Sequence, residues 1–216
     1  MEQSPAISLI KPRLRGVSHQ LAFFAALGAG AVLIALAPPR AKLAAAIYAG
    51  SLATMLGTSA LYHRPNWAPG PRRWMRRADH AAIFVLIAGT YTPFTLLLPQ
   101  GGAAMLAVAW GGAALGILRS LFWVNAPPAL AAGLYIAFGS AILLFWSPLH
   151  AALGAGALAV LVFGGLLYSL GAIVYAARRP DPAPAVFGYH EIFHVFVIAA
   201  AICHFTVIVG VMRALR

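Results

Sequence analysis

The chain has 216 residues, of which 62% are hydrophobic and 9% are charged. A typical soluble domain is about 45–50% apolar and about 25% charged, so this composition excludes a soluble globule, a disordered tail and a collagen-like fibre. Lysine and arginine number 15 against 4 acidic residues, a net charge of +11, and their position in short gaps between long apolar runs indicates membrane topology rather than a nucleic-acid partner.

The apolar runs predict seven transmembrane helices, because one span needs about 20 predominantly apolar residues. Short breaks rich in Pro, Gly and Arg separate the runs and leave no room for a soluble domain between them. We therefore expect an all-α polytopic membrane protein: a single seven-helix integral membrane domain over residues 1–216, with residues 1–17 as a cytoplasmic amino-terminal segment. In chain order, the expected spans cover residues 19–37, 43–62, 79–98, 102–122, 128–146, 151–176 and 186–212.

The first run also admits a signal-peptide interpretation, because it has a basic flank and ends in Ala35-Leu36-Ala37. The length of the run, and Pro38 directly after the candidate cleavage point, favour an uncleaved span. Of the 15 lysines and arginines, 11 fall on the amino-terminal side of the predicted bundle and 4 on the other. The positive-inside rule therefore predicts a multi-pass plasma (inner) membrane protein with a cytoplasmic amino terminus and an external carboxyl terminus.

Ionisable residues inside spans are costly, which makes them functional candidates. His63 ends the second predicted span, and His190 and His194 lie in the first turns of the seventh, so the topology puts all three at the cytoplasmic side. His190 and His194 are four residues apart, on one helix face, and can hold one metal ion. With His63 they supply the three protein ligands of a catalytic zinc site. The alternative is that these histidines are polar residues packed against neighbouring helices.

Two further residues fall at the same depth. Asp79 begins the third predicted span, where it is either a first-turn helix acid with an arginine partner or a carboxylate that orients or deprotonates metal-bound water. Ser59 precedes His63 by one turn and is, with Asp79, a candidate catalytic residue that hydrogen-bonds into the site; the alternative is that it packs between helices. Whether His19 or Glu191 joins the site is left open. The remaining histidines, His80, His150 and His204, point elsewhere or lie at other depths.

These residues resemble the hemolysin III family, the bacterial branch of the progestin and adipoQ receptor (adiponectin receptor-like) family. The likeness rests on Ser59-Ala60-Leu61-Tyr62-His63, on Asp79 sixteen residues later, and on His190-Glu191-Ile192-Phe193-His194, and it covers nearly the whole chain. The resemblance implies Zn²⁺ held by His63, His190 and His194, with Asp79 near the metal-bound water. One departure is that Pro12 and Arg15 stand about where many members carry Glu and Asn, so the resemblance does not assign the first span a part in the site.

Three functions follow from these observations. The first is a zinc-dependent membrane hydrolase acting on a lipid amide or ester, as the resemblance to ceramidase-like membrane hydrolases implies, with a role in membrane homeostasis. The second is a seven-helix receptor or sensor in which the zinc is structural. The third is a hemolysin-type lytic or channel protein, for which the later spans carry few of the polar residues that a pore needs. Membrane lipids are the expected substrates or ligands in each case.

Overall fold

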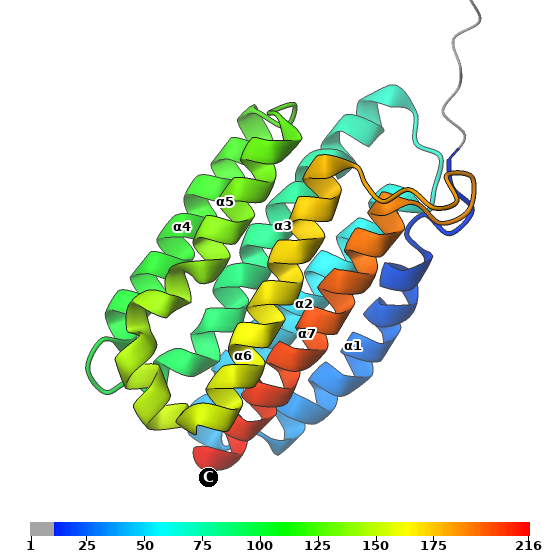
Figure 1. Cartoon of the computed structure of the whole chain (residues 1–216). Coiled ribbons are helices and arrows are strands. Elements are labelled where there is room, and N and C mark those ends of the chain that lie inside the picture. The colour runs from blue at the N-terminus through cyan, green and yellow to red at the C-terminus, as the bar shows by residue number, and fades with distance from the viewer. Residues whose placement is uncertain (1–10) are drawn as a thin grey trace, which may run out of the picture.

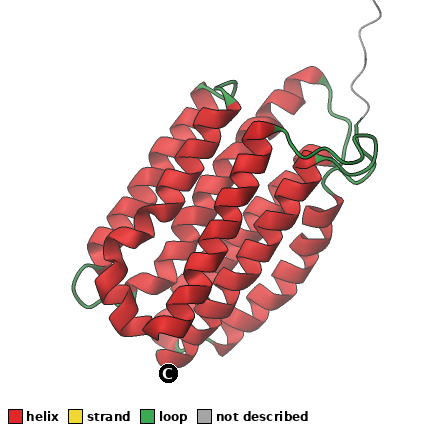
Figure 2. Ribbon diagram, in the orientation of Figure 1, coloured by secondary structure: helices red, strands yellow, loops and turns green. Residues whose placement is uncertain are grey.

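The computed structural model describes residues 11–216, and over that range the chain is a helical bundle (Figures 1 and 2). Two short 3-10 helices, η1 (Pro39–Ala41) and η2 (Ala141–Phe145), join α1 to α2 and α5 to α6. No strand forms within the described range, where Ala183 and Phe187 make an isolated bridge. The all-α prediction is confirmed for these residues. The α-helices are α1 (Val17–Leu36), α2 (Lys42–His63), α3 (Pro69–Thr95), α4 (Gly102–Phe122), α5 (Pro128–Ser140), α6 (Trp146–Ala177) and α7 (Tyr189–Ala214).

Five helical segments of residues 11–216 are long and apolar enough to cross a membrane, and they point to an integral membrane protein. The segment Pro128–Ala177 contains both the fifth and the sixth expected spans. α3 is not among the five: its amino-terminal part carries four arginines, Arg72, Arg73, Arg76 and Arg77, and polar residues flank the apolar stretch of its later part. Seven crossings, one domain and a cytoplasmic amino terminus therefore stay predictions. The five segments are Val17–Leu36, Pro39–His63, Gly102–Phe122, Pro128–Ala177 and Tyr189–Ala214.

Two helix boundaries differ most from the expected spans. α3 begins at Pro69, with a proline in the first helical turn as is common there, so Asp79 is the eleventh residue of that helix. The interpretation of Asp79 as a first-turn acid is therefore wrong. Hydropathy missed this start because the first turns of α3 are polar. The expected fifth span also does not continue to residue 146, since α5 ends at Ser140 and η2 follows.

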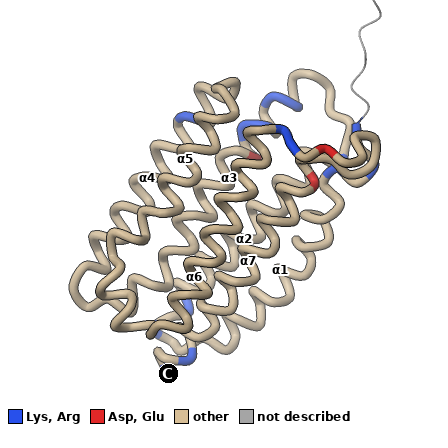
Figure 3. Tube along the Cα trace, in the orientation of Figure 1, with Lys and Arg blue, Asp and Glu red and all other residues tan. Residues whose placement is uncertain are grey.

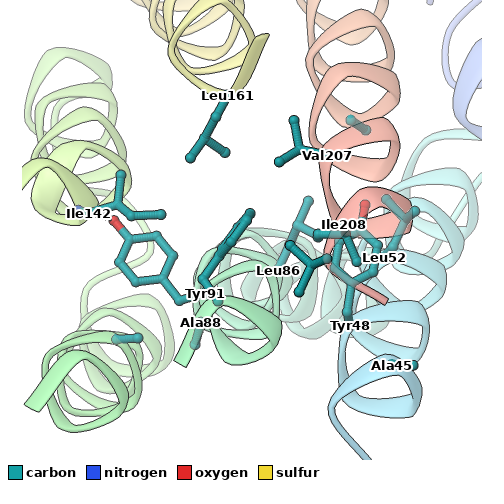
Figure 4. Packing of buried hydrophobic residues seen from close by; sticks show 14 of the residues in the cluster. Ala45, Tyr48, Leu52, Leu86, Ala88, Tyr91, Ile142, Leu161, Val207 and Ile208 are labelled. Atoms are coloured by element: carbon teal, nitrogen blue, oxygen red, sulfur yellow. Dashed lines mark hydrogen bonds between the residues drawn. The ribbon is translucent and has the colours of Figure 1, made fainter. Parts of the chain in front are cut away.

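Tyr91 of α3 explains how the bundle accommodates the break between α5 and η2 (Figure 4). Its hydroxyl accepts a hydrogen bond from the backbone N–H of Ile142 at 2.7 Å and donates to the carbonyl of Phe138 at the same distance. These backbone groups lose their helical partners where the helix ends, and a buried backbone group needs a substitute. Around this contact, aliphatic residues of α2, α3 and α7 form the core, including Leu52, Leu86 and Ile208.

Residues 11–16 tie three elements together at one end of the bundle. Arg13 and Leu14 donate backbone hydrogen bonds to Ala185 and Val186 in the α6–α7 loop, at 3.0 and 3.1 Å. Lys11 Nζ donates to the carbonyl of Arg64, just after α2, at 2.7 Å. Partial burial and the charge of the nearby Arg64 lower the pKa of Lys11. These contacts bring the starts of α1 and α7 and the end of α2 to one place (Figure 1).

Candidate metal centre

Three histidines converge where α2 ends and α7 begins. His63 is the last residue of α2, and His190 and His194 lie in the first two turns of α7. One ring nitrogen of each lies within 4.8 Å of the chosen nitrogens of the other two. Nε2 of His63 and Nε2 of His190 are 3.1 Å apart. The structure thus brings together the three residues that the sequence proposed as metal ligands.

Glu191 stabilises the start of α7, next to the histidine cluster. Glu191 Oε2 accepts a hydrogen bond from the backbone N–H of Gly188 at 2.8 Å, which caps the helix. Its other oxygen, Oε1, accepts from Nε of Arg15 in the segment before α1. The Glu191 side chain is 3% exposed, so this ion pair is shielded from water on the glutamate side. Together the cap and the ion pair hold the helical turn that carries His190 and His194.

His19 of α1 lies against the same cluster. Its ring stacks on the ring of His194, with centroids 3.8 Å apart and an angle of 11° between the planes. Its Nδ1 is 2.9 Å from Oγ of Ser59. The first span therefore does contribute a residue to the site, although the segment that precedes it departs from the family pattern. The structure also places Ser59 against His19, a partner that the sequence did not indicate.

Asp79 reaches the cluster from α3. Its Oδ2 lies 3.9 Å from Nε2 of His63, and its side chain is 15% exposed. Asp79 lies in the third turn of α3. The carboxylate, the serine and the histidines thus come from α1, α2, α3 and α7.

The histidine nitrogens fit a transition-metal ion. His63 and His190 face each other through ring nitrogens that can share one proton at most. His194 Nδ1 is buried and has no hydrogen-bond partner among residues 11–216. Buried polar atoms are almost always paired, and imidazole nitrogens are preferred ligands of zinc and its neighbours. A metal ion between the three rings would give the facing nitrogens of His63 and His190 a common partner, with one ring nitrogen of His194 within reach.

The other histidines lie apart from this trio, as the sequence predicted. His80 Nδ1 contacts the hydroxyl of Tyr135 at 3.0 Å. His204 Nε2 contacts the carbonyl of Leu161 at 3.1 Å. His150 is an exposed residue of α6. None of the three belongs to the group that can hold a metal.

A cavity of about 390 Å³ opens from the histidines into the bundle. Arg15, Arg72 and Arg76 stand at its polar end, and aliphatic residues of α3, α6 and α7 line the rest, among them Leu86 and Leu161. The sequence did not predict this cavity, because apolar residues that line a hollow look the same as residues that fill a core. The place of Arg15 at this cavity could have been predicted, because Arg15 stands one turn before His19 in the sequence.

The chain is similar to known proteins over most of its length. The model of a family described as Haemolysin-III related matches residues 7–205. Hemolysin-3 of Bacillus cereus is 32% identical over 163 residues, which is 74% of this chain and 71% of that protein. The Hemolysin-3 homolog of Bacillus subtilis (strain 168) is 36% identical over 129 residues, 59% of this chain and 58% of the relative. An adiponectin receptor protein of Drosophila melanogaster is 31% identical over 153 residues, 62% of this chain and 34% of that receptor.

Proposed function

This chain belongs to the haemolysin-III-related family, and from that premise we propose that it is a zinc-dependent membrane hydrolase acting on a lipid amide or ester. The proposal includes seven membrane crossings, a cytoplasmic amino terminus and a role in membrane homeostasis. It also includes a single membrane domain over residues 1–216.

The observation that carries the proposal is the position of the three histidines and Asp79 at the end of an apolar cavity. We assign His63, His190 and His194 as the ligands of the zinc ion. When bound, zinc supplies Lewis acidity, which polarises a carbonyl group and makes water more acidic. The aliphatic wall of the cavity has the chemistry to receive an acyl chain.

Asp79 is the proposed general base. Its carboxylate takes a proton as water adds to the carbonyl carbon, and it returns that proton to the nitrogen or oxygen that leaves. The carbon–nitrogen or carbon–oxygen bond then breaks, giving a carboxylic acid and an amine or alcohol. Ser59, the second residue proposed for catalysis, is better described as a positioning residue, since its hydroxyl contacts His19, which stacks on His194.

A receptor or sensor with a structural zinc is the second candidate, and His19 is the observation that favours it. Structural zinc sites are usually closed by four protein ligands. Nε2 of His19 is buried and has no hydrogen-bond partner among the described residues. The adiponectin receptor protein among the relatives is consistent with this reading. A lytic or channel function, which the names of the Bacillus relatives suggest, is less favoured because the cavity wall is largely apolar.

Turnover of defined lipids by the purified protein tests the hydrolase against the receptor. We expect wild type loaded with zinc to hydrolyse at least one lipid from a panel of amides and esters. Asp79→Asn should lower the rate by about 10²–10⁴-fold, the usual contribution of a general base. Asp181→Asn is the matched control, since Asp181 accepts a hydrogen bond from the Tyr189 backbone and asparagine keeps that acceptor. An Asp79→Asn variant as active as wild type removes Asp79 from the mechanism.

A further inference from the structure

A second hollow lies between α1 and α7, near the carboxyl end of both helices and far along them from the histidines. The two helices run in the same direction side by side (Figure 1). The groove has a volume of about 360 Å³, and its wall is apolar on both sides. Gly28, Val32 and Leu36 line it from α1, and Phe205, Val209 and Met212 from α7. These positions recur every three or four residues, so each helix presents one continuous face.

Cationic side chains gather at the end of this groove. Arg213 and Arg216 line it, and Arg216 Nη2 donates to the carbonyl of Leu36 at 3.0 Å. Arg40 stands beside them, with Nε donating to the carbonyl of Leu215 at 3.1 Å. All the acidic side chains of residues 11–216 lie at the opposite end of the bundle (Figure 3). The positive charge at the groove therefore has no acidic side chain to balance it within the described chain.

We propose that this groove binds one anionic phospholipid, with its phosphate at Arg213 and Arg216 and one acyl chain along α1 from Gly28 to Leu36. Guanidinium groups bind phosphate oxygens through paired, charge-assisted hydrogen bonds. The stretch of α1 is about 12 Å long at a rise of about 1.5 Å per residue, so it holds a large part of an acyl chain. Gly28 widens the groove, since a Cβ built there meets no atom within 4 Å. This binding site is independent of the proposed hydrolase.

A phospholipid suits the groove better than a second copy of this chain. A symmetric pairing through this face would bring Arg213 and Arg216 of both copies together, and like charges at an interface repel. A phospholipid supplies a negative charge for the two arginines and an apolar acyl chain that fills the groove.

The test is native mass spectrometry of the full-length protein in detergent. Phosphatidylglycerol and phosphatidylcholine with identical acyl chains are added at equal concentration, and the bound lipid is counted. We expect wild type to retain phosphatidylglycerol in preference, and the double variant Arg213→Ala/Arg216→Ala to lose that preference by on the order of tenfold. Arg178→Ala/Arg179→Ala is the matched control, because it removes the same charge from two exposed residues at the other end.

A second variant tests the groove without changing charge. Gly28→Leu fills the space beside Val32 and should lower retention of phosphatidylglycerol, while thermal unfolding reports that the variant is folded. Unchanged phosphatidylglycerol retention after removal of Arg213 and Arg216, or an equal loss in the Arg178 and Arg179 control, overturns the headgroup site. Equal retention of both lipids by wild type overturns the preference for an anion. Full retention by folded Gly28→Leu overturns the acyl-chain placement.

Discussion

The imidazole rings of His19 and His194 lie face to face, with centroids 3.8 Å apart and planes inclined by 11°. This stack joins the first helix to the seventh at the histidine cluster. Because His19 is in turn held by Ser59, a serine of α2 reaches a proposed metal ligand of α7 through one intervening ring. The stack makes His19 a support for His194, whereas the receptor proposal makes His19 a fourth ligand.

Replacing His19 tests whether it acts at the metal. If His19 supports His194, His19→Ala should weaken zinc binding by about 10–100-fold, the usual effect of losing a residue that orients a ligand. Competition with a zinc-specific chelator measures this change. His150→Ala is the control, because His150 is exposed and outside the cluster. A variant that binds zinc as tightly as wild type contradicts any role of His19 at the metal.

Gly16 should not tolerate a side chain. Its φ of +79° lies in the left-handed region, and a Cβ built there falls 2.7 Å from Cβ of His63. Gly16→Ala should therefore lower the free energy of unfolding by about 1–2 kcal/mol from backbone strain alone, and by more if His63 cannot move. Thermal unfolding in detergent measures the loss. Gly70→Ala should be nearly neutral, since no atom lies within 4 Å of its Cβ position.

The ion pair between Arg15 and Glu191 should act as a unit. Arg15→Met leaves the carboxylate of Glu191 shielded and unpaired, and we expect a loss of about 2 kcal/mol, less than for a fully buried pair because the Arg15 side chain is 21% exposed. Arg15→Met/Glu191→Gln should recover part of this stability, because glutamine can still cap Gly188 and carries no charge. Chemical unfolding of both variants, beside Arg13→Met at an exposed neighbour, checks the order. Equal stability of Arg15→Met and wild type would contradict it.

Tyr91 should stabilise the break between α5 and η2 through its hydroxyl. Tyr91→Phe removes the acceptor for the Ile142 N–H, a buried contact, and should destabilise the fold by about 1–3 kcal/mol, the usual effect of leaving a buried donor unpaired. The matched control is Tyr189→Phe, because the Tyr189 hydroxyl makes no hydrogen bond with another residue of 11–216, where its backbone N–H is what donates to Asp181. Comparable unfolding midpoints for the two variants would show that the hydroxyl of Tyr91 has no such role.

The sequence predicted the proposed ligands because it gives both the spacing of the histidines and their depth in the predicted spans. The four-residue step from His190 to His194 fixes one helix face, and the ends of the apolar runs place His63 at the same level. The structure brings the three together. The start of α3 was not predicted, because its first turns are rich in arginine and the apolar pattern of the sequence indicated a span only from residue 79.

Contacts between helices could not be predicted from the sequence. The stack of His19 on His194 depends on which helices are neighbours, and neither periodicity nor charge gives that information. Likewise the ion pair of Arg15 and Glu191 joins residues 176 positions apart. The internal cavity was missed for a related reason. Leu86 and Leu161 give the same hydrophobic pattern in the sequence whether they fill a core or line a cavity.

The zinc content of the purified protein tests the central claim most directly. Elemental mass spectrometry of wild type should give about one zinc ion per chain. His63→Ala, His190→Ala and His194→Ala should each lose it, while His150→Ala, an exposed histidine, keeps it. Folded wild type that contains no metal, even after zinc is supplied, would contradict the metal centre and with it the proposed hydrolase.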